Sequence, residues 1–289
     1  MNSLFKAITV AFTALLSAPA FAELPLRVAL LPDENAATVI QDNAPLERYL
    51  EHRINREIDL VVTTDYSAMI EAVRFGRIDL AYFGPASYTI AKERMVSSDF
   101  DIVPFAARLK GGEATYHSVI VAKTGSGIES LADLRGQSAD VAFGDPASTS
   151  SHLAPKHAML QAGLIEGEDF VSRFTGGHDA VAVSVAAGHA LAGGLSKPIY
   201  EKLLARGVID PDALTVIAIT DPLPQYPWVM RTDLPDALQH KIRTAFADIS
   251  LGTESGRAVL DPFGAEGFAP INDAAYDVIR EIRASTRDQ

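Results

Sequence analysis

Short apolar segments alternate with longer amphipathic ones along most of the chain. Three of them, "PLRVALLP" (25–32), "EIDLVVTT" (57–64) and "IDLAYFG" (78–84), have the composition and the bounding turn residues of strands. Between and after them, "APLERYLEHRINRE" and "DYSAMIEAVRFGR" place apolar residues at helical spacing, and "PASYTIAKERM" opens with Pro85, a favoured first-turn residue. This alternation predicts the α/β class, with parallel strands covered by helices.

The same order starts again after residue 115. The second block reads as strands in "YHSVIVAKTGSGI", "QSADVAFG" and "ALTVIAIT", and as helices in "SSHLAPKHAMLQAG", "HDAVAVSVAAG" and "KPIYEKLLARG", followed by helical stretches near 235–250, 255–263 and 274–286. Two blocks without a low-complexity linker predict two lobes, residues 23–118 plus 221–289 and residues 119–220. We expect the crossings in "SVIVAK" and "TVIAIT", and a small-ligand site in the cleft between the lobes.

The N-terminal segment "MNSLFKAITVAFTALLSAPAFAE" has the pattern of a secretory signal. Lys6 provides a positive charge, residues 7–16 form an apolar stretch too short to span a bilayer, and "AFA" suits cleavage. We therefore predict a signal peptide over residues 1–22 and a mature chain of 289 − 22 = 267 residues that begins at Glu23. The alternative is a first buried helix of the fold.

Composition and charge narrow the function further. The chain contains no cysteine, which excludes disulfides and a lipid-modified cysteine anchor and predicts a freely soluble exported protein, periplasmic in a Gram-negative cell. The formal charge is −12, and the sequence contains no cluster of Lys and Arg. This argues against binding to nucleic acid or insertion into anionic membranes. A small anion can still bind where donors cluster inside a cleft.

The segment "GDPASTSSHLAP" (144–155) contains more hydroxyl groups than one helix cap requires. Pro155 fits only near the first turn of a helix, so the helix should begin near Ser150 or Ser151. Free backbone amides at a helix N-terminus, with several added hydroxyls, suit a tetrahedral oxyanion. The alternative is a helix cap with surplus solvated serines, and this stretch alone leaves both interpretations open.

Other donor side chains occupy similar positions. Tyr66 follows Asp65 at a predicted helix start, Tyr82 ends a strand, Tyr116 lies where the chain enters the second block, and His178 follows two glycines at a helix start. Ends of strands in α/β folds gather ligand residues, although each Tyr taken singly is more often a core or rim residue, and His178 is more often a helix cap or a surface residue. The histidines lack the spacing of a zinc motif, so we predict no metal and no cofactor.

Several of these segments together resemble a known family. "DYSAMIEAVRFGRIDLAYFGPASY", "TYHSVIVAK", "ADVAFGDPASTSSHLAPKHAM" and "GGHDAVAVSVAAG", in this order, resemble the phosphate/phosphite/phosphonate substrate-binding proteins of ABC importers. The resemblance runs from about Leu26 to beyond Trp228 and implies a two-lobed type II periplasmic-binding-protein fold that closes over its ligand. It also implies that the family's oxyanion-binding triplet, ligand tyrosines and binding histidine correspond to Ser148, Thr149 and Ser150, to Tyr66 and Tyr116, and to His178.

The sequence departs from the family at points that bear on the ligand. Family members that bind aminoethylphosphonate hold its ammonium group with acidic side chains, and the matching positions here carry Pro198 and Tyr226; Leu191 also stands where relatives commonly carry Asp. A cationic tail without a counter-charge in a desolvated cleft is costly. We therefore expect a ligand without an amine, such as phosphite, methylphosphonate or phosphate, with Tyr82 and Tyr226 among its contacts.

These expectations describe a non-enzymatic, monomeric solute-binding protein that delivers its ligand to an inner-membrane permease. One alternative is a binding protein of the same fold for another small anion such as sulfate, and another is a sensor subunit that reports to a membrane kinase. A third alternative is an exported serine hydrolase that uses Ser150 and His178. No GxSxG, Walker, GxGxxG or HExxH motif supports an enzyme.

Overall fold

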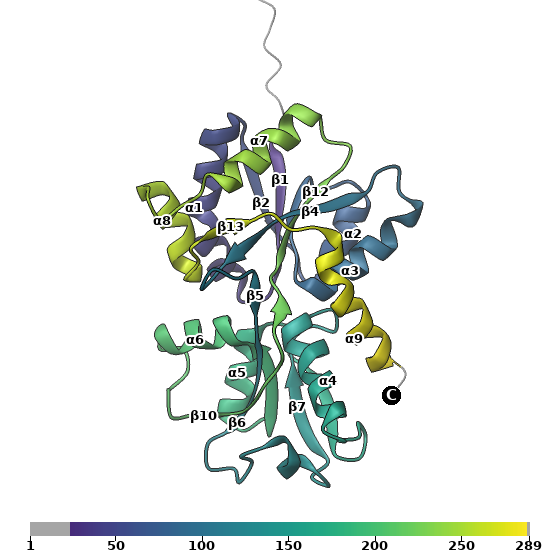
Figure 1. Cartoon of the computed structure of the whole chain (residues 1–289). Coiled ribbons are helices and arrows are strands. Elements are labelled where there is room, and N and C mark those ends of the chain that lie inside the picture. The colour runs from purple at the N-terminus through teal and green to yellow at the C-terminus, as the bar shows by residue number, and fades with distance from the viewer. Residues whose placement is uncertain (1–23, 288–289) are drawn as a thin grey trace, which may run out of the picture.

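The computed structural model of the protein describes residues 24–287 and has two lobes, one above the other in Figure 1. Each lobe is built on its own β-sheet with helices on both faces. The predicted signal peptide lies outside the described residues. Within those residues, we find no helix with the length and apolarity to cross a membrane.

The first lobe contains a six-stranded sheet in the order β13-β4-β12-β3-β1-β2. Its strands are β1 (Leu26–Leu30), β2 (Ile58–Val62), β3 (Leu80–Tyr82), β4 (Ile102–Leu109), β12 (Pro227–Arg231) and β13 (Gly267–Ala269). Strand β1 pairs in parallel with β2 and β3, whereas β12 runs antiparallel between β3 and β4. The helices of this lobe are α1 (Ala36–Ile54), α2 (Tyr66–Arg74), α3 (Pro85–Arg94), α7 (Asp236–Ala247), α8 (Glu254–Leu260) and α9 (Asp277–Arg287).

The second lobe contains a five-stranded sheet in the order β10-β6-β9-β7-β8. Its strands are β6 (Ser118–Lys123), β7 (Ala139–Phe143), β8 (Phe170–Phe174), β9 (Ala192–Ser196) and β10 (Leu214–Ile219). The helices are α4 (Ala154–Gln161), α5 (His178–Ala187) and α6 (Lys197–Ala205). Separate apolar clusters, one containing Val121 and Val181 and the other Ile120 and Phe143, pack against the sheet, so the helices stabilise this lobe from two sides.

The chain passes between the lobes through a short antiparallel pair, β5 (Thr115–Tyr116) and β11 (Leu223–Pro224). This pair lies directly before β6 and directly after β10, so the crossings flank the two strands in which we expected them. A third connection runs along α9, which extends from the first lobe beside α4 (Figure 1). On α9, Arg283 donates to Thr89 of α3 at 3.0 Å, and the Ser285 hydroxyl lies 3.5 Å from Nδ1 of His157 on α4.

The structure adds elements that the apolar pattern did not predict. Strand β9 has the sequence "AGGLS", which reads as a turn, yet it is buried at the centre of the second sheet. Its glycines admit two helices, because a Cβ at Gly193 would lie 2.7 Å from Val181 and one at Gly194 would lie 2.4 Å from Pro155. Helix α1 likewise begins earlier than expected, at Ala36, because the Asn35 side chain accepts a hydrogen bond from the Ala37 amide at 3.0 Å.

Candidate ligand-binding site

Helices from both lobes begin at the cleft between the two sheets. Four cross-lobe hydrogen bonds join these helix starts: Ala86 N to Thr149 Oγ1 (2.7 Å), His178 N to Asp33 O (2.8 Å), Asn35 N to Asp179 Oδ2 (3.1 Å) and Tyr66 N to Asp145 Oδ2 (3.3 Å). The lobes are therefore in contact across the cleft in this structure. Because the positive ends of helix dipoles gather there, the junction favours an anion.

The hydroxyl-rich segment begins with a π-helical turn, Thr149–Leu153, that continues into α4. Ser148 caps this turn by accepting a hydrogen bond from the Ser151 amide at 3.1 Å. The Ser151 hydroxyl has a structural role, because it donates to the Gly194 carbonyl at 2.6 Å and accepts from the Gly144 amide at 2.9 Å. One serine of the segment is therefore the cap, and another is fixed to the sheet.

The remaining hydroxyls of the segment face the other lobe. Thr149 accepts the hydrogen bond of the Ala86 amide, and the Ser150 hydroxyl lies 3.3 Å from that of Tyr226. Ser148, Thr149 and Ser150 are at most 2% exposed. Since a hydroxyl that accepts one bond can still donate its own proton, Ser148 and Thr149 each keep a donor for a ligand.

His178 is buried at the start of α5 and is held in one tautomer. Its Nδ1 accepts a hydrogen bond from the Ser196 amide at 2.9 Å, so the proton is on Nε2. Nε2 is buried without a partner among the described residues. Burial, with a smaller contribution from Lys202, lowers the pKa of His178 to about 3, so the ring is a neutral donor at physiological pH.

Four tyrosines surround the hydroxyl segment from the side of the first lobe. The rings of Tyr82 and Tyr116 lie 5.4 Å and 5.1 Å from that of Tyr226. The Tyr116 hydroxyl is a buried polar atom that makes no well-formed hydrogen bond within the described part of the chain, although the hydroxyls of Thr149, Ser150 and Tyr226 interact with it. Burial is the main cause that raises the pKa values of Tyr66, Tyr82, Tyr116 and Tyr226, so all four phenols remain protonated and able to donate.

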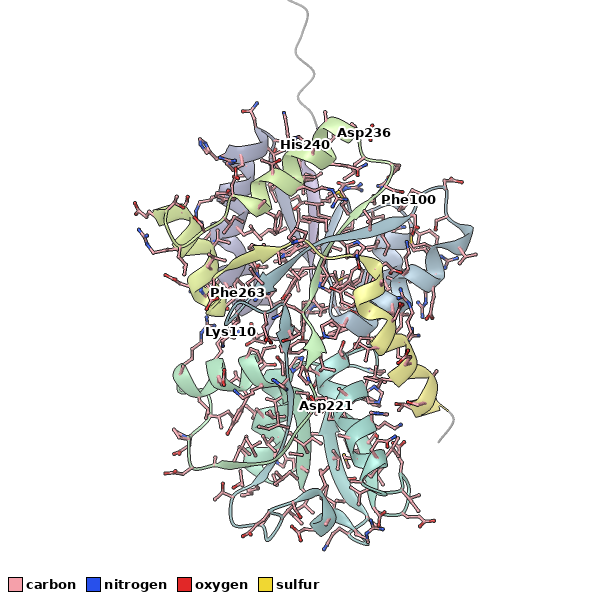
Figure 2. All side chains as sticks on the ribbon, in the orientation of Figure 1. Phe100, Lys110, Asp221, Asp236, His240 and Phe263 are labelled. Carbon is pink, nitrogen blue, oxygen red and sulfur yellow. The ribbon has the colours of Figure 1, made fainter. Side chains whose placement is uncertain are left out.

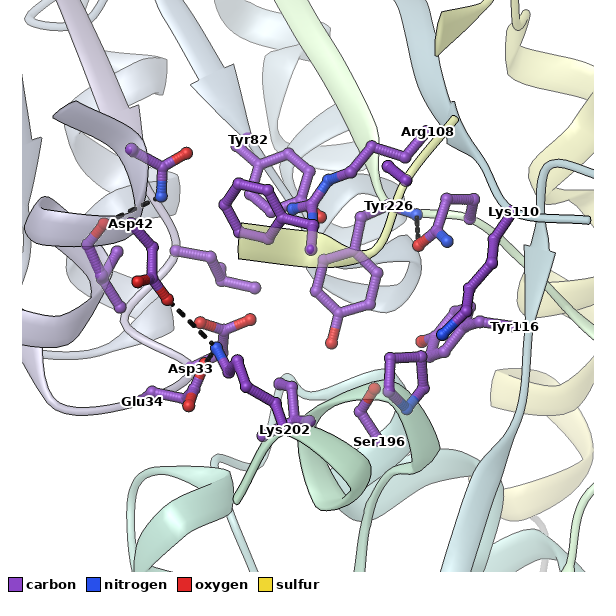
Figure 3. Close-up of a pocket in the computed structure, with 18 of the residues that line it drawn as sticks. Asp33, Glu34, Asp42, Tyr82, Arg108, Lys110, Tyr116, Ser196, Lys202 and Tyr226 are labelled. Atoms are coloured by element: carbon purple, nitrogen blue, oxygen red, sulfur yellow. Dashed lines mark hydrogen bonds and ion pairs between the residues drawn. The ribbon is translucent and has the colours of Figure 1, made fainter. Parts of the chain in front are cut away.

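A cavity of about 70 Å³ opens beside these groups (Figure 3). Tyr82, Tyr116 and Tyr226 line it directly. Ser150 connects to it through Tyr226, and His178 connects to it through Ser196, which is also in its wall. Lys110 and Phe263, which also line it, lie at the junction of the lobes, whereas Asp236 and His240 lie at the far end of the first lobe (Figure 2). The structure thus gathers the predicted tyrosines, hydroxyls and histidine around one junction.

The cavity also has charged residues that the sequence reasoning missed: Asp33, Glu34, Asp42, Arg108, Lys110 and Lys202. Glu34 and Asp42 form ion pairs with Lys202 of the second lobe, and Arg206 bonds to Asp42 at 2.7 Å. Arg108 is held between aromatic rings, with its guanidinium carbon 4.5 Å from the centroid of Tyr82 and 3.8 Å from that of Phe263. These residues are a mixed-charge layer beside the neutral donors.

The acidic residues of this layer correct part of the sequence-based inference that the cleft has no carboxylate for an amine. Pro198 and Tyr226 do line the cavity, but Leu191 packs against the core of the second lobe. Carboxylates are nevertheless present, because Asp33 and Glu34 follow β1, at the carboxyl end of a parallel strand. That position was the available signal, since strand ends in α/β folds gather ligand residues.

The geometry does not support the hydrolase alternative. The Ser150 hydroxyl is paired with Tyr226 and Nδ1 of His178 with Ser196, so these residues form no Ser–His hydrogen bond. In the described part of the chain, no group of three or more His, Cys, Asp or Glu side chains is placed to hold a metal ion.

The chain matches the family described as "ABC transporter, phosphonate, periplasmic substrate-binding protein" over residues 28–276. It belongs to this family. The chain is therefore a periplasmic substrate-binding component of an ABC importer rather than an enzyme, as the resemblance implied.

Individual relatives agree with this assignment. The chain is 28% identical to the phosphate-import protein PhnD of Mycolicibacterium smegmatis, over 89% of this chain and 84% of the relative. It is 26% identical to the phosphonates-binding periplasmic protein of Escherichia coli, over 95% of this chain and 82% of the relative. Among solved structures, PhnD1 of Prochlorococcus marinus in complex with methylphosphonate superposes with a TM-score of 0.81 at 24% identity, covering 91% of this chain and 98% of the other. This likeness confirms the two-lobed fold.

Proposed function

We propose that the protein binds a small phosphorus oxyanion, namely phosphite, methylphosphonate or phosphate, at the junction of its lobes. Hydroxyl groups donate to the ligand from Ser148, Thr149, Ser150 and Tyr226, and His178 donates from Nε2. The first lobe surrounds the ligand with Tyr66, Tyr82 and Tyr116. Three buried donors have no partner within the described residues, namely Tyr116 Oη, His178 Nε2 and Trp228 Nε1. The observation that carries the proposal is that the first two belong to residues predicted to bind the ligand. Buried polar groups are almost always hydrogen-bonded, so a ligand that accepts both bonds completes the site.

The protonation state of the donors supports an oxyanion. Low-dielectric surroundings keep His178 neutral and the phenols protonated, so the site has many donors and little added positive charge. A tetrahedral oxyanion has several oxygens that need convergent donors, and hydrogen bonds to charged acceptors are stronger than neutral ones. Hydroxyls also accept, which suits a ligand whose own protonation varies.

Lobe closure completes the binding mechanism that we propose. The two lobes move as rigid bodies about the β5–β11 pair, which is the hinge between them. One lobe is formed by residues 23–118 plus 221–289 and the other by residues 119–220. The bond from the Ala86 amide to Thr149 and the ion pairs of Lys202 with Glu34 and Asp42 hold the closed form. The closed protein then delivers its ligand to the permease as a monomer.

Two of the three cavity carboxylates offer no free counter-charge for an amine, which supports a ligand without one. Glu34 and Asp42 are already compensated by ion pairs to Lys202 and Arg206, whereas Asp33 has no ion pair among the described residues. We also propose that residues 1–22 are a signal peptide, because their charge, their apolar stretch and the small residues in "AFA" have that pattern.

Calorimetry on the mature chain tests the ligand class. The panel is phosphite, phosphate, methylphosphonate, aminoethylphosphonate and sulfate. We expect the compound that binds most tightly to be one of the first three. Binding of none of the phosphorus compounds would refute the proposal. Much tighter binding of aminoethylphosphonate would refute the choice of ligand without an amine.

A further inference from the structure

Arg108 differs from the other cations of the cavity wall, because its side chain forms no ion pair and no hydrogen bond within the described part of the chain. It lies near the end of β4, and its side chain reaches over the cavity beside Tyr82 (Figure 3). Lys110 and Lys202 form ion pairs with acidic residues. The guanidinium of Arg108 therefore brings five N–H donors and a full positive charge to the cavity without an acidic partner.

Two aromatic rings hold this guanidinium in place. Its central carbon lies 4.5 Å from the centroid of Tyr82 and 3.8 Å from that of Phe263. Arginine stacks on aromatic faces through its delocalised charge, and the stacking leaves the N–H groups at the edge of the guanidinium free. An arginine in a protein also keeps its proton at any ordinary pH. Arg108 is therefore a fixed positive charge in the cavity wall.

A substituent on the phosphorus of the proposed ligand would enter this cavity. Tyr116 and Tyr226, two of the proposed ligand contacts, line it, and the Ser150 hydroxyl lies 3.3 Å from that of Tyr226. The volume of about 70 Å³ is several times what one water molecule requires, so a tail of a few atoms fits. The end of that tail would share the cavity with Arg108.

The charge of Arg108 acts on the groups around this space. Burial is the main cause that raises the pKa values of Tyr82 and Asp33, and the Arg108 charge opposes burial at both groups. Asp33 is also the cavity carboxylate without an ion pair. An ammonium group in the cavity would be attracted by Asp33 and repelled by Arg108, so the two effects offset each other. The cost of removing the ammonium group from water would then remain uncompensated.

We propose that Arg108 is a specificity-determining residue whose fixed charge rejects phosphonates with an ammonium group on the tail and admits those with an uncharged substituent. This inference rests on the proposed function, which it extends from the oxyanion to its tail. The ammonium group of aminoethylphosphonate and the terminal methyl group of propylphosphonate are nearly equal in size, so these two ligands differ in charge rather than in shape. Phosphite has no carbon substituent, and Arg108 should affect its binding little.

Calorimetry on the Arg108→Met protein tests this role. Methionine has a flexible apolar side chain that can pack against the two rings, and it removes the charge. The affinity for aminoethylphosphonate should rise roughly tenfold or more, because two like charges no longer meet in the cavity. The affinities for propylphosphonate and phosphite should stay within a few-fold of wild type. Arg108→Lys keeps a positive charge and should keep the wild-type preference for propylphosphonate over aminoethylphosphonate.

Arg243→Met on α7 is the matched control. Arg243 is exposed, lies outside the cavity and also stacks on an aromatic ring, with its guanidinium carbon 5.7 Å from the centroid of Phe105. The same substitution there should leave all three affinities at their wild-type values. If Arg108→Met does not fold, Arg108→Gln removes the same charge. Wild-type protein by itself should bind propylphosphonate at least roughly tenfold more tightly than aminoethylphosphonate.

The outcomes separate this inference from the proposed function. An unchanged ratio of the affinities for propylphosphonate and aminoethylphosphonate in Arg108→Met would overturn the role of Arg108 and leave the proposed function intact. An equal gain for both ligands would also overturn it, because Arg108 would then act by occupying space. So would a wild-type protein that binds phosphite but not propylphosphonate, since the tail would not enter the cavity. Failure of every phosphorus oxyanion to bind wild-type protein would overturn both proposals.

Discussion

Thr149 offers a sharp test of the site, because its hydroxyl has two roles. It accepts the 2.7 Å hydrogen bond from the Ala86 amide across the cleft, and its proton remains available for the ligand. Valine has the same shape without the hydroxyl. In the closed Thr149→Val protein the Ala86 amide is a buried donor without an acceptor, a penalty of about 1–3 kcal/mol. Because about 1.4 kcal/mol is a factor of ten, this term alone weakens ligand binding by roughly 5- to 150-fold, and loss of the ligand bond adds to it.

Opening of the lobes lets water reach the Ala86 amide, so the penalty affects closure more than folding. Urea unfolding of ligand-free Thr149→Val should therefore change by less than about 1 kcal/mol, while calorimetry with phosphite shows the weakened affinity. Thr149→Ser keeps the hydroxyl and is the matched control, which should remain within a few-fold of wild type. Wild-type affinity in Thr149→Val would refute both roles assigned to this hydroxyl.

Three further predictions concern closure, packing and pH. Lys202→Met leaves Glu34 of the first lobe without its cation and Asp42 with Arg206 alone, so we expect roughly tenfold weaker ligand binding and a larger radius of gyration of the free protein in X-ray scattering. An unchanged radius and affinity would contradict this prediction. Gly194→Ala places a methyl group 2.4 Å from Pro155 and should lower the free energy of unfolding by about 1–3 kcal/mol. In the control Gly252→Ala the nearest atom is 3.6 Å from the new methyl group, so the free energy of unfolding should change by less than about 0.5 kcal/mol. Burial lowers the pKa of His178 from 6.5 to about 3, so the unfolded chain takes up a proton before the folded one does, and the free energy of unfolding of the wild type falls as the pH drops below about 6.5. His178→Gln cannot take up this proton, so its free energy of unfolding should lack this pH-dependent loss. An equal difference in the free energy of unfolding between the two proteins at pH 7.5 and pH 4.5 would argue against this prediction.

Local sequence patterns predicted those strands and helices in which the spacing of apolar residues matches the face that the fold buries. The apolar runs of β1, β2 and β10 and the helical spacing of α2, α5 and α6 are visible along the chain, because strands and helices bury side chains with different periods. The same reasoning placed tyrosines and hydroxyls at strand ends and helix starts. The roles of Tyr66, Tyr82, Tyr116, Ser148, Thr149, Ser150, His178 and Tyr226 in binding remain predictions.

The tertiary structure decided what depends on segments distant in sequence. Strand β9 could not be recognised from "AGGLS", because its glycines are required by Val181 and Pro155 of two separate helices. The state of each hydroxyl in residues 148–151 depends on partners as distant as Ala86, Gly194 and Tyr226.

Local periodicity and residue chemistry were thus enough to predict the α/β class, the family resemblance and the types of donor expected at the cleft. Only the folded chain decided which donors remain free and which charges are paired. Burial and hydrogen bonding across the lobes set the tautomer of His178 and the unpaired state of the Asp33 carboxylate, and neither property exists until two distant segments meet.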